Sequence, residues 1–552
     1  MSAAHFQELA RAYYSAWFRY HPEAAVDAGV PGYAHLLPRC TEEARGALVC
    51  LNDELRAGLE ELDRGGLGAD EALDYDLLLG AIRLENQYLL DIEPRCPDPQ
   101  RWLPIHAVYQ LTIRPVEDFE DALRARLAAI PAFLREVREF LIPRAAGIPP
   151  LWLQSAVAAA RGGIAFLRGL PQHPKIAAAG EGMRLEAALG TAIRSLGEHA
   201  DFLATDLAAR ARGAFACGEA YFEQLLGQRH FLDVSLDELY RFGQELVART
   251  RSELAAACRA LTGGEDLAAA LARFRAEHPA RDRLLEVYRQ EMRAARAFVA
   301  ARGLVAMPER EGLDVVETPA FLRHEIPFAA YCEPAPNDPE QRGYYYVTPP
   351  ETDAALAEHD YAGIQHTCVH EAWPGHHLQF VTANRNPVAR TLPRLLNASA
   401  TLYEGWALYS ESLMRAQGFL GRPEQGLLLL RDRLWRALRI LIDIGIHTRG
   451  ETLETGAQRL VEQLGFPPAQ ALAELTWYSR APTVPLGYAV GWALIDTLRG
   501  EANLPLREFH DRLLSAGSIA LPLVIRRAFG AETWSQVQGS VFGPRTERSA
   551  GG

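Results

Sequence analysis

The chain has 552 residues, of which 49% are hydrophobic and 23% are charged, and its formal net charge is −13 at pH 7. Such a composition is typical of a globular protein, long enough for several domains or for one large helical one. The excess of acidic residues argues against a nucleic-acid partner, because nucleic-acid binding needs a basic face.

The start of the chain and its cysteines bear on its location. Residues 1–8 contain no basic segment followed by an apolar one, as a secretory signal peptide would. No apolar run approaches the roughly 18 residues of a membrane span. The seven cysteines are scattered and form no Cys-x-x-Cys pair, as is typical of reduced thiols. We therefore expect a cytoplasmic protein with no membrane partner, while the oligomeric state stays open.

Residues 1 to about 300 are predicted to be helical. Apolar residues recur at intervals of three and four, for example at Phe6, Leu9, Tyr13 and Trp17. Between about 117 and 260 the strong helix formers Ala, Leu, Arg and Glu dominate. We expect residues 1–300 to form an N-terminal helical region and residues 301–552 to carry the candidate site, with the two forming one continuous structural unit.

The pattern changes at about residue 303, where valines, phenylalanines and prolines indicate short strands and turns. The run Tyr344-Tyr345-Tyr346-Val347-Thr348 has the composition of a strand. Helices are predicted again from about residue 353 almost to the end. The residues from 303 to 350 therefore predict a small sheet within a mainly helical chain.

A histidine-rich stretch follows, His370-Glu371-Ala372-Trp373-Pro374-Gly375-His376-His377. Three imidazoles and a carboxylate within eight residues are typical of a hydrolytic zinc site, where neutral nitrogens bind the metal and an unbound Glu activates water. In the usual motif, His-Glu-x-x-His, both histidines lie on one face of a helix. Here Pro374 stands in place of the second histidine and removes a helical amide, so we expect a bend or bulge there.

The bulge decides which histidine is the second ligand. One or two extra residues would bring His376 to that place, so we predict His370 and His376 as ligands, with His377 as the alternative. His366 with His370, spaced i and i+4, is a third option. It is less favoured because Glu371 would then follow both ligands. These could instead be ordinary helix-end or surface histidines, but four of the chain's 16 histidines lie within these twelve residues.

The stretch Tyr403-Glu404-Gly405-Trp406-Ala407-Leu408-Tyr409-Ser410-Glu411 supplies candidate carboxylates. Glu404 is the predicted third ligand of one Zn²⁺ per chain, because a return helix could bring it back to the histidines. Glu411, two helical turns later, is the rival ligand or a partner that orients a ligand histidine. The alternative is an ordinary amphipathic helix with two solvated glutamates.

Three further groups could complete a catalytic site. Asp443 and His447 are spaced i and i+4 in a predicted long helix, so the carboxylate could orient the imidazole. Tyr488, on a predicted Pro/Gly-rich loop, could donate to a developing oxyanion. A strand beside a metal helix commonly offers its edge to an extended substrate, so we expect Tyr344, Tyr345 and Tyr346 to bind substrate. The alternative is an edge strand that only covers the core.

Together these stretches resemble the domain of unknown function 885 family, in the gluzincin-like zinc metallopeptidase clan. The resemblance spans nearly the whole chain. Its main carriers are His370 to Gln379, Glu404 to Glu411 and Asp443 to Thr448, with fainter matches at His21 to Ala25, Asp74 to Leu78 and the Tyr344 strand. It implies a mainly α, zincin-like metallopeptidase fold with a small β-sheet, about residues 303–350, beside the metal-site helices.

Two positions depart from the family pattern. An Arg precedes the Tyr that matches Tyr478 in the family, and here the residue is Trp477. A Gln is expected before Tyr488, and here the residue is Val484. The missing Arg removes a fixed cation that could hold a substrate carboxylate. We therefore expect the chemistry to be retained and the substrate to differ from a generic peptide.

The expected activity is zinc-dependent hydrolysis of a peptide or amide bond. His370, His376 and Glu404 would bind the metal, Glu371 would act as general base, and Tyr488 or His447 would stabilise the oxyanion. The expected partner is a small peptide or a small-molecule amide. Two alternatives stay open: a metalloenzyme that acts on a non-peptide small molecule in specialised metabolism, and a non-catalytic binding protein with a vestigial site. Manganese or cobalt would also suit such nitrogen and oxygen ligands.

Overall fold

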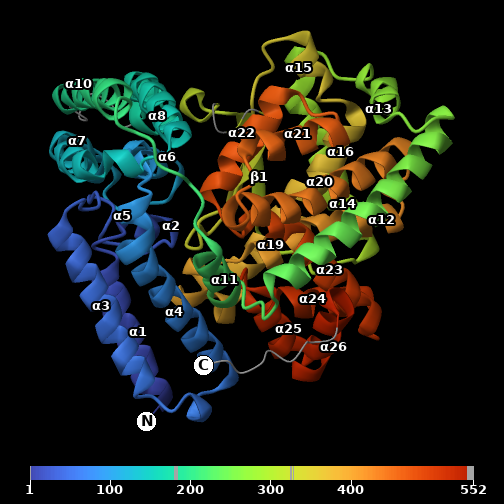
Figure 1. The fold of residues 1–552 in the computed structure, drawn as a ribbon, viewed down its shortest axis with the longest axis horizontal. Coiled ribbons are helices and arrows are strands. Elements are labelled where there is room, and N and C mark those ends of the chain that lie inside the picture. The colour runs from blue at the N-terminus through green and yellow to red at the C-terminus, as the bar shows by residue number, and fades with distance from the viewer. Residues whose placement is uncertain (1, 179–184, 324–325, 327, 544–552) are drawn as a thin grey trace.

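The computed structural model describes residues 2–178, 185–323, 326 and 328–543. Helices dominate the first 302 residues, as the apolar periodicity predicted. In Figure 1 the first ten, blue to green, gather on one side of the molecule. They are α1 (Ser2–Trp17), α2 (Pro22–Asp27), α3 (Glu42–Glu60), α4 (Ala69–Gln87), α5 (Glu93–Arg95), α6 (Ile105–Ile113), α7 (Phe119–Leu141), α8 (Pro150–Gly169), α9 (Pro174–Ala177) and α10 (Glu186–Phe202).

Four more helices lead to the other side of the molecule, α11 (Glu219–Gln228), α12 (Leu236–Thr262), α13 (Leu267–Arg275) and α14 (Leu284–Arg302). The start of α12 shows why it begins there. The Ser235 hydroxyl accepts a bond from the Glu238 amide at 3.2 Å, and the Glu238 carboxylate accepts one from the Ser235 amide at 2.9 Å. This reciprocal cap satisfies two amides that the first turn leaves unpaired.

The sheet has three strands, β1 (Gly312–Glu317), β2 (Ala329–Cys332) and β3 (Arg342–Val347), which lie within the range predicted for it. Their order is β1-β3-β2, with β1 parallel and β2 antiparallel to β3. Gly312 pairs with Arg342, and Ala329 pairs with Val347. The strand with the three consecutive tyrosines is therefore the central one.

The rest of the chain is helical. Its helices are α15 (Asp353–Ala357), α16 (Tyr361–Glu371), α17 (His376–Arg385), α18 (Leu392–Leu396), α19 (Ala400–Ala416), α20 (Pro423–Thr448), α21 (Leu453–Leu464), α22 (Pro468–Arg480), α23 (Val484–Glu501), α24 (Leu506–Leu513), α25 (Leu521–Phe529) and α26 (Ala531–Phe542). In the described part of the chain, no helix combines the length and hydropathy that a bilayer crossing needs. All seven cysteines are free thiols.

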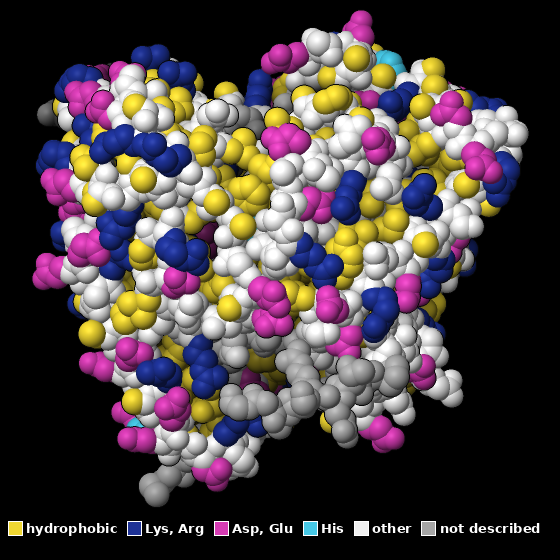
Figure 2. All heavy atoms as spheres, viewed as in Figure 1, with side chains coloured by type: hydrophobic (Ala, Val, Ile, Leu, Met, Phe, Trp, Pro, Cys, Tyr) yellow, Lys and Arg dark blue, Asp and Glu magenta, His cyan; other side chains and the backbone are white. Residues whose placement is uncertain are grey.

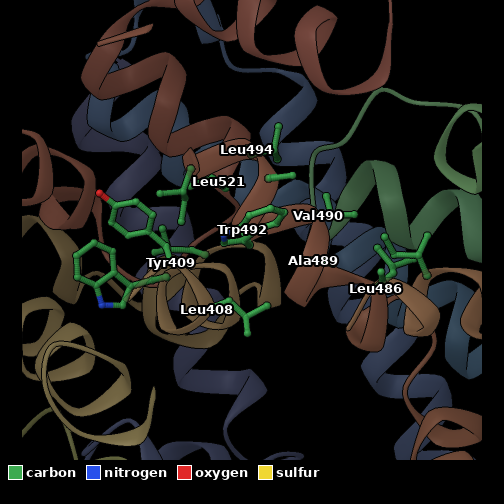
Figure 3. Close-up of a cluster of buried hydrophobic side chains, with 14 of the residues drawn as sticks. Leu408, Tyr409, Leu486, Ala489, Val490, Trp492, Leu494 and Leu521 are labelled. Atoms are coloured by element: carbon green, nitrogen blue, oxygen red, sulfur yellow. The ribbon is translucent and has the colours of Figure 1, made fainter. Parts of the chain in front are cut away.

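Helices α19 and α23 pack closely in the main core, where Leu408 and Tyr409 lie among side chains of α23 (Figure 3). Two glycines allow this approach. A Cβ on Gly405 would lie 2.5 Å from the Gly491 carbonyl carbon, and a Cβ on Gly491 would lie 2.0 Å from the Thr401 oxygen. The crossing brings the Glu404 segment of α19 against the helix that carries Tyr488.

Candidate metal centre

The expected interruption of the histidine helix is present. Helix α16 ends at Glu371 and α17 begins at His376, so residues 372–375 separate the two, instead of a bulge of one or two residues. The Gly375 amide donates to the Val369 carbonyl at 3.1 Å. A Cβ on Gly375 would lie 1.8 Å from the His370 carbonyl oxygen, so only glycine fits. This close turn brings His376 back beside His370.

His370, His376 and Glu404 converge, with one ligand atom of each within 4.8 Å of the others. Glu404 Oε2 lies 3.2 Å from His376 Nε2 and 3.6 Å from His370 Nε2. All three side chains are buried, yet Glu404 Oε2 has no well-directed hydrogen bond among the described residues. A buried carboxylate oxygen that lies between two imidazole nitrogens without a well-directed hydrogen bond fits a metal ion. Two imidazoles and a carboxylate are also the donors of an open zinc site.

Glu411 has the orienting position rather than a place in the cluster. Its Oε1 accepts a bond from His370 Nδ1 at 2.7 Å. With the proton held on Nδ1, the lone pair of His370 Nε2 faces Glu404 and His376, as a metal ligand requires. The other carboxylate oxygen lies 3.0 Å from His366 Nε2. His366 therefore contacts Glu411 on the side away from His370, and the third option, His366 with His370 as ligands, does not form.

The cluster favours positive charge at its centre. Burial alone would lower the pKa of His370, but the nearby carboxylates of Glu404 and Glu411 outweigh burial and raise that pKa to about 10. Burial raises the pKa of both glutamates, yet their histidine partners hold it well below the ordinary value. Two ionised carboxylates thus lie deep in the protein beside imidazoles. A divalent cation would supply the charge that a proton on His370 otherwise provides.

His377, the alternative ligand, points away from the cluster. Its Nε2 lies 2.9 Å from Glu311 Oε2, with both side chains fully buried, and its Nδ1 lies 3.1 Å from the Tyr331 hydroxyl. A Cβ on Gly343 would lie only 2.9 Å from His377 Nδ1. The imidazole therefore packs against strand β3 at a position where the side chain is absent. His377 therefore holds α17 to the sheet and offers no nitrogen to the cluster.

Glu371, the predicted base, is half-buried and makes no hydrogen bond or ion pair with the residues that the structure describes. It is the next residue after His370, and its charge adds to the effect of burial in raising the pKa of the Tyr331 and Tyr345 phenols. The carboxylate is therefore near both phenols. A carboxylate without partners there can accept a proton.

Tyr488 reaches the cluster, but from helix α23 instead of the predicted loop. Its hydroxyl lies near the Glu404 carboxylate, and burial together with that carboxylate raises the pKa of Tyr488 well above the ordinary value. The Arg439 guanidinium lies 4.3 Å from the Tyr488 ring centroid. Tyr488 is thus a protonated donor at the edge of the cluster.

His447 and Asp443 do not act as predicted. His447 Nε2 donates to the Tyr478 carbonyl at 3.0 Å, and Nδ1 is 3.5 Å from the Cys217 amide, so both nitrogens bond to the main chain. Burial lowers the pKa of His447 to about 4. Asp443 Oδ1 lies 3.8 Å from His447 Nε2, too far for a hydrogen bond. The Asp443 carboxylate accepts instead from the Thr483 and Leu486 amides, at 3.1 and 3.4 Å. His447 is therefore not free to stabilise an oxyanion, and Asp443 anchors the start of α23.

The expectation that Tyr344, Tyr345 and Tyr346 form a substrate-binding edge is wrong, and so is its alternative of a covering edge strand. Strand β3 has a neighbour on both sides, so its main-chain groups are used within the sheet. Tyr345 is fully buried, and the Tyr346 hydroxyl bonds to that of Tyr109. Three successive β-forming residues predicted the strand but could not predict its place in the sheet.

Three residues near the cluster were missed from the sequence. Tyr331 lies on the edge strand β2, with its ring 6.1 Å from that of His376. Tyr403 has its ring 6.3 Å from His376. Arg439 donates to the Tyr478 hydroxyl at 2.8 Å and also lies over Tyr488. Only Tyr403 had a signal, its place next to Glu404, because the other two come from distant segments without a motif.

Three comparisons with known proteins bear on the chain. A family model described as "Bacterial protein of unknown function (DUF885)" matches residues 22–527. No curated protein matches. Among solved structures, "a putative lipoprotein of unknown function" from Shewanella oneidensis is 21% identical, with a TM-score of 0.74, over 94% of this chain and 98% of that one. A "putative lipoprotein" from Colwellia psychrerythraea is 19% identical, with a TM-score of 0.79, over 95% and 98%. At these identities the likeness concerns the fold alone.

Proposed function

The chain belongs to the DUF885 family of bacterial proteins of unknown function, and we propose that it is a zinc-dependent hydrolase of the metallopeptidase type that cleaves a peptide or amide bond. One observation carries this proposal. His370 Nδ1 is held by Glu411 at 2.7 Å, and this leaves Nε2 to converge with His376 and Glu404 beside the unpartnered Glu371. An oriented donor set next to a free carboxylate fits hydrolysis better than a structural site.

The roles of the residues follow from their positions. A zinc ion held by His370, His376 and Glu404 would polarise the scissile carbonyl and lower the pKa of a water molecule. Glu371 takes a proton from the attacking water and returns it to the leaving nitrogen. The Tyr488 hydroxyl donates to the oxygen on which charge develops. The edge strand β2, which carries Tyr331 beside His376, replaces β3 as the strand that an extended substrate would contact.

A second candidate is a non-peptide small-molecule substrate. Trp477 and Val484 replace residues of the family pattern next to Tyr488, and the Trp477 ring lies 6.3 Å from the Tyr488 ring. An indole beside the proposed oxyanion donor makes this wall more apolar than a guanidinium would. The choice between the two candidates is a matter of substrate, because the same groups perform the chemistry.

Elemental analysis tests the metal, and a matched variant tests the base. Purified protein should contain about one zinc per chain, and His370→Ala should lose it. Glu371→Gln should keep the zinc, because Glu371 is not a ligand, but should lose about 10²- to 10⁴-fold in turnover on responsive amides. Absence of metal in the wild type after reconstitution would refute the hydrolase. Undiminished turnover of Glu371→Gln would refute Glu371 as the base.

A further inference from the structure

A cavity of about 530 Å³ lies between the N-terminal helices and the segments next to the cluster. Helices α1 and α4 line one wall, and residues 396–398 and 479–482 line the other. Two stretches of the family pattern that the chemistry does not use, at His21 and at Leu77 and Leu78, contribute to the first wall. A cavity of this size holds a small molecule.

The charged lining of this cavity is basic. Four arginines and two carboxylates line it, which leaves a balance of +2 with His21 neutral, in a chain whose net charge is −13. Both carboxylates already have partners, because Glu85 binds His21 at 2.9 Å and Asp98 binds Arg480 at 3.1 Å. On the outer face drawn in Figure 2, acidic and basic side chains are interspersed instead. The positive charge of the cavity is therefore local.

Two of the four arginines form no ion pair among the described residues, although the Tyr88 phenol and, after it, the Glu93 and Glu85 carboxylates are near enough to help raise the pKa of Arg101. Arg95 pairs with Asp91, and Arg480 pairs with Asp98. Arg101 and Arg229 form no ion pair with any residue in the described ranges, and the Arg101 guanidinium lies 4.6 Å from the Tyr88 ring centroid. Burial raises the pKa of Tyr221, whereas the positive charges of Arg229 and Arg101 lower it. The two guanidinium groups therefore lie near the same phenol. Guanidinium groups bind planar anions through paired N–H groups.

Tyr403 lies near both the Arg229 end of this cavity and the metal centre. His230, the residue after Arg229, bonds to the Ser399 hydroxyl at 2.8 Å, and the Tyr403 amide donates to the Ser399 carbonyl at 3.2 Å. On one side the Tyr403 ring lies 6.3 Å from His376. On the other side Arg229 is near enough to oppose burial and Glu404, which raise the pKa of the Tyr403 phenol. The apolar part of the cavity is rich in aromatic rings, among them Trp17, Tyr88 and Trp152. A molecule with an anionic end and an apolar body would match this lining.

We propose that the substrate of this hydrolase is a small amide with an anionic group, a carboxylate or a phosphate, which Arg101 and Arg229 bind in the cavity while the amide lies at the metal centre past Tyr403. The identity of the cleaved bond rests on the proposed function. Binding of the anionic group rests only on the cavity and its two unpaired arginines. The two can therefore be tested apart.

The test measures binding to metal-free protein, so that an anion cannot bind to zinc instead. Three probes share an aromatic ring: N-acetylphenylalanine, its uncharged carboxamide, and phenyl phosphate. Calorimetry should detect one or both anions and not the carboxamide. Arg101→Gln and Arg229→Gln should each weaken anion binding about 10- to 100-fold, the effect of one charge-assisted hydrogen bond. Arg83→Gln, on the exposed face of α4, is the matched control and should change nothing.

Lysine at position 101 or 229 keeps the charge and should retain part of the affinity. If a glutamine variant fails to fold, the binding of N-acetylphenylalanine and of its carboxamide to the wild-type protein still tests whether the cavity requires an anionic group. With zinc restored, N-acetyl dipeptides with a free carboxylate should have a lower KM than their amidated forms, and the arginine variants should remove this difference. Equal affinity for the acid and the carboxamide would overturn the proposal. Anion affinity that is unchanged in both arginine variants would do the same. Neither result depends on whether the protein hydrolyses an amide. Arginine-dependent binding without hydrolysis of any amide would overturn the hydrolase and leave an anion-binding cavity.

Discussion

Adjacent histidines give the sharpest test of the metal centre. His376 faces Glu404 at 3.2 Å, whereas His377 faces Glu311 at 2.9 Å on the opposite side of the same turn. His376→Ala should therefore weaken metal binding strongly, and His377→Ala should leave it unchanged. His377→Ala should instead destabilise the fold. The same substitution at two neighbouring positions should therefore have opposite effects on zinc affinity and on the stability of the metal-free protein.

The magnitudes follow from the contacts. A closed zinc site contributes about 10–16 kcal/mol through four ligands, so loss of one ligand is on the order of 3 kcal/mol, or about 100-fold in metal affinity. Removing His377 breaks a fully buried pair, which costs about 3–5 kcal/mol. Arg296 remains 2.6 Å from Glu311 as a counter-charge, so we expect the lower end, about 3 kcal/mol.

Two assays separate these effects. Competition with a chromophoric chelator gives the zinc affinity of each variant, and urea unfolding of metal-free protein gives its stability. His376→Ala should show the affinity loss with little change in the metal-free midpoint, and His377→Ala should show the reverse. Metal loss in His377→Ala together with metal retention in His376→Ala would reverse the ligand assignment and refute the geometry proposed for the cluster.

Three other predictions concern the surroundings of the cluster and the fold. Glu411→Gln should weaken zinc binding about 10- to 100-fold in the chelator assay, because the bond that orients His370 loses its charge. Tyr488→Phe should keep the metal and lower kcat about 10²- to 10³-fold with a smaller change in KM, and an unchanged kcat would remove Tyr488 from the mechanism. Asp70 binds Arg394 and Arg527, and its bond to Arg527 lowers the pKa of Asp70 to about 2. The contribution of these ion pairs to the free energy of unfolding is therefore complete above about pH 4 and is lost as the pH falls toward 2. Because this carboxylate is partly exposed, Asp70→Asn should cost only roughly 1 kcal/mol at pH 7. The loss of stability in urea unfolding should shrink steadily between pH 4 and pH 3, and a loss that stays constant would exclude the ion pairs as its cause.

The sequence predicted the parts of the site that depend on neighbours along the chain. Pro374 and Gly375 dictated a break after Glu371, because proline removes an amide and only glycine fits against the His370 carbonyl. Helical spacing placed Glu404 and Glu411 two turns apart on one face, which is why one reaches the cluster and the other lies behind His370. The apolar periodicity predicted the helices, and the β-forming run predicted a strand.

The tertiary structure decided what depends on distant partners. Adjacent residues of a helix point about 100° apart, so the sequence could not choose between His376 and His377 until Glu404 and Glu311 were in place on either side. Three tyrosines in a row predict a strand, but only pairing with β1 and β2 makes it the central one. The spacing of Asp443 and His447 fits a pair, yet the Tyr478 carbonyl and the Thr483 amide take their bonding groups. Local spacing fixes which side chains share a face, whereas long-range packing fixes what that face meets.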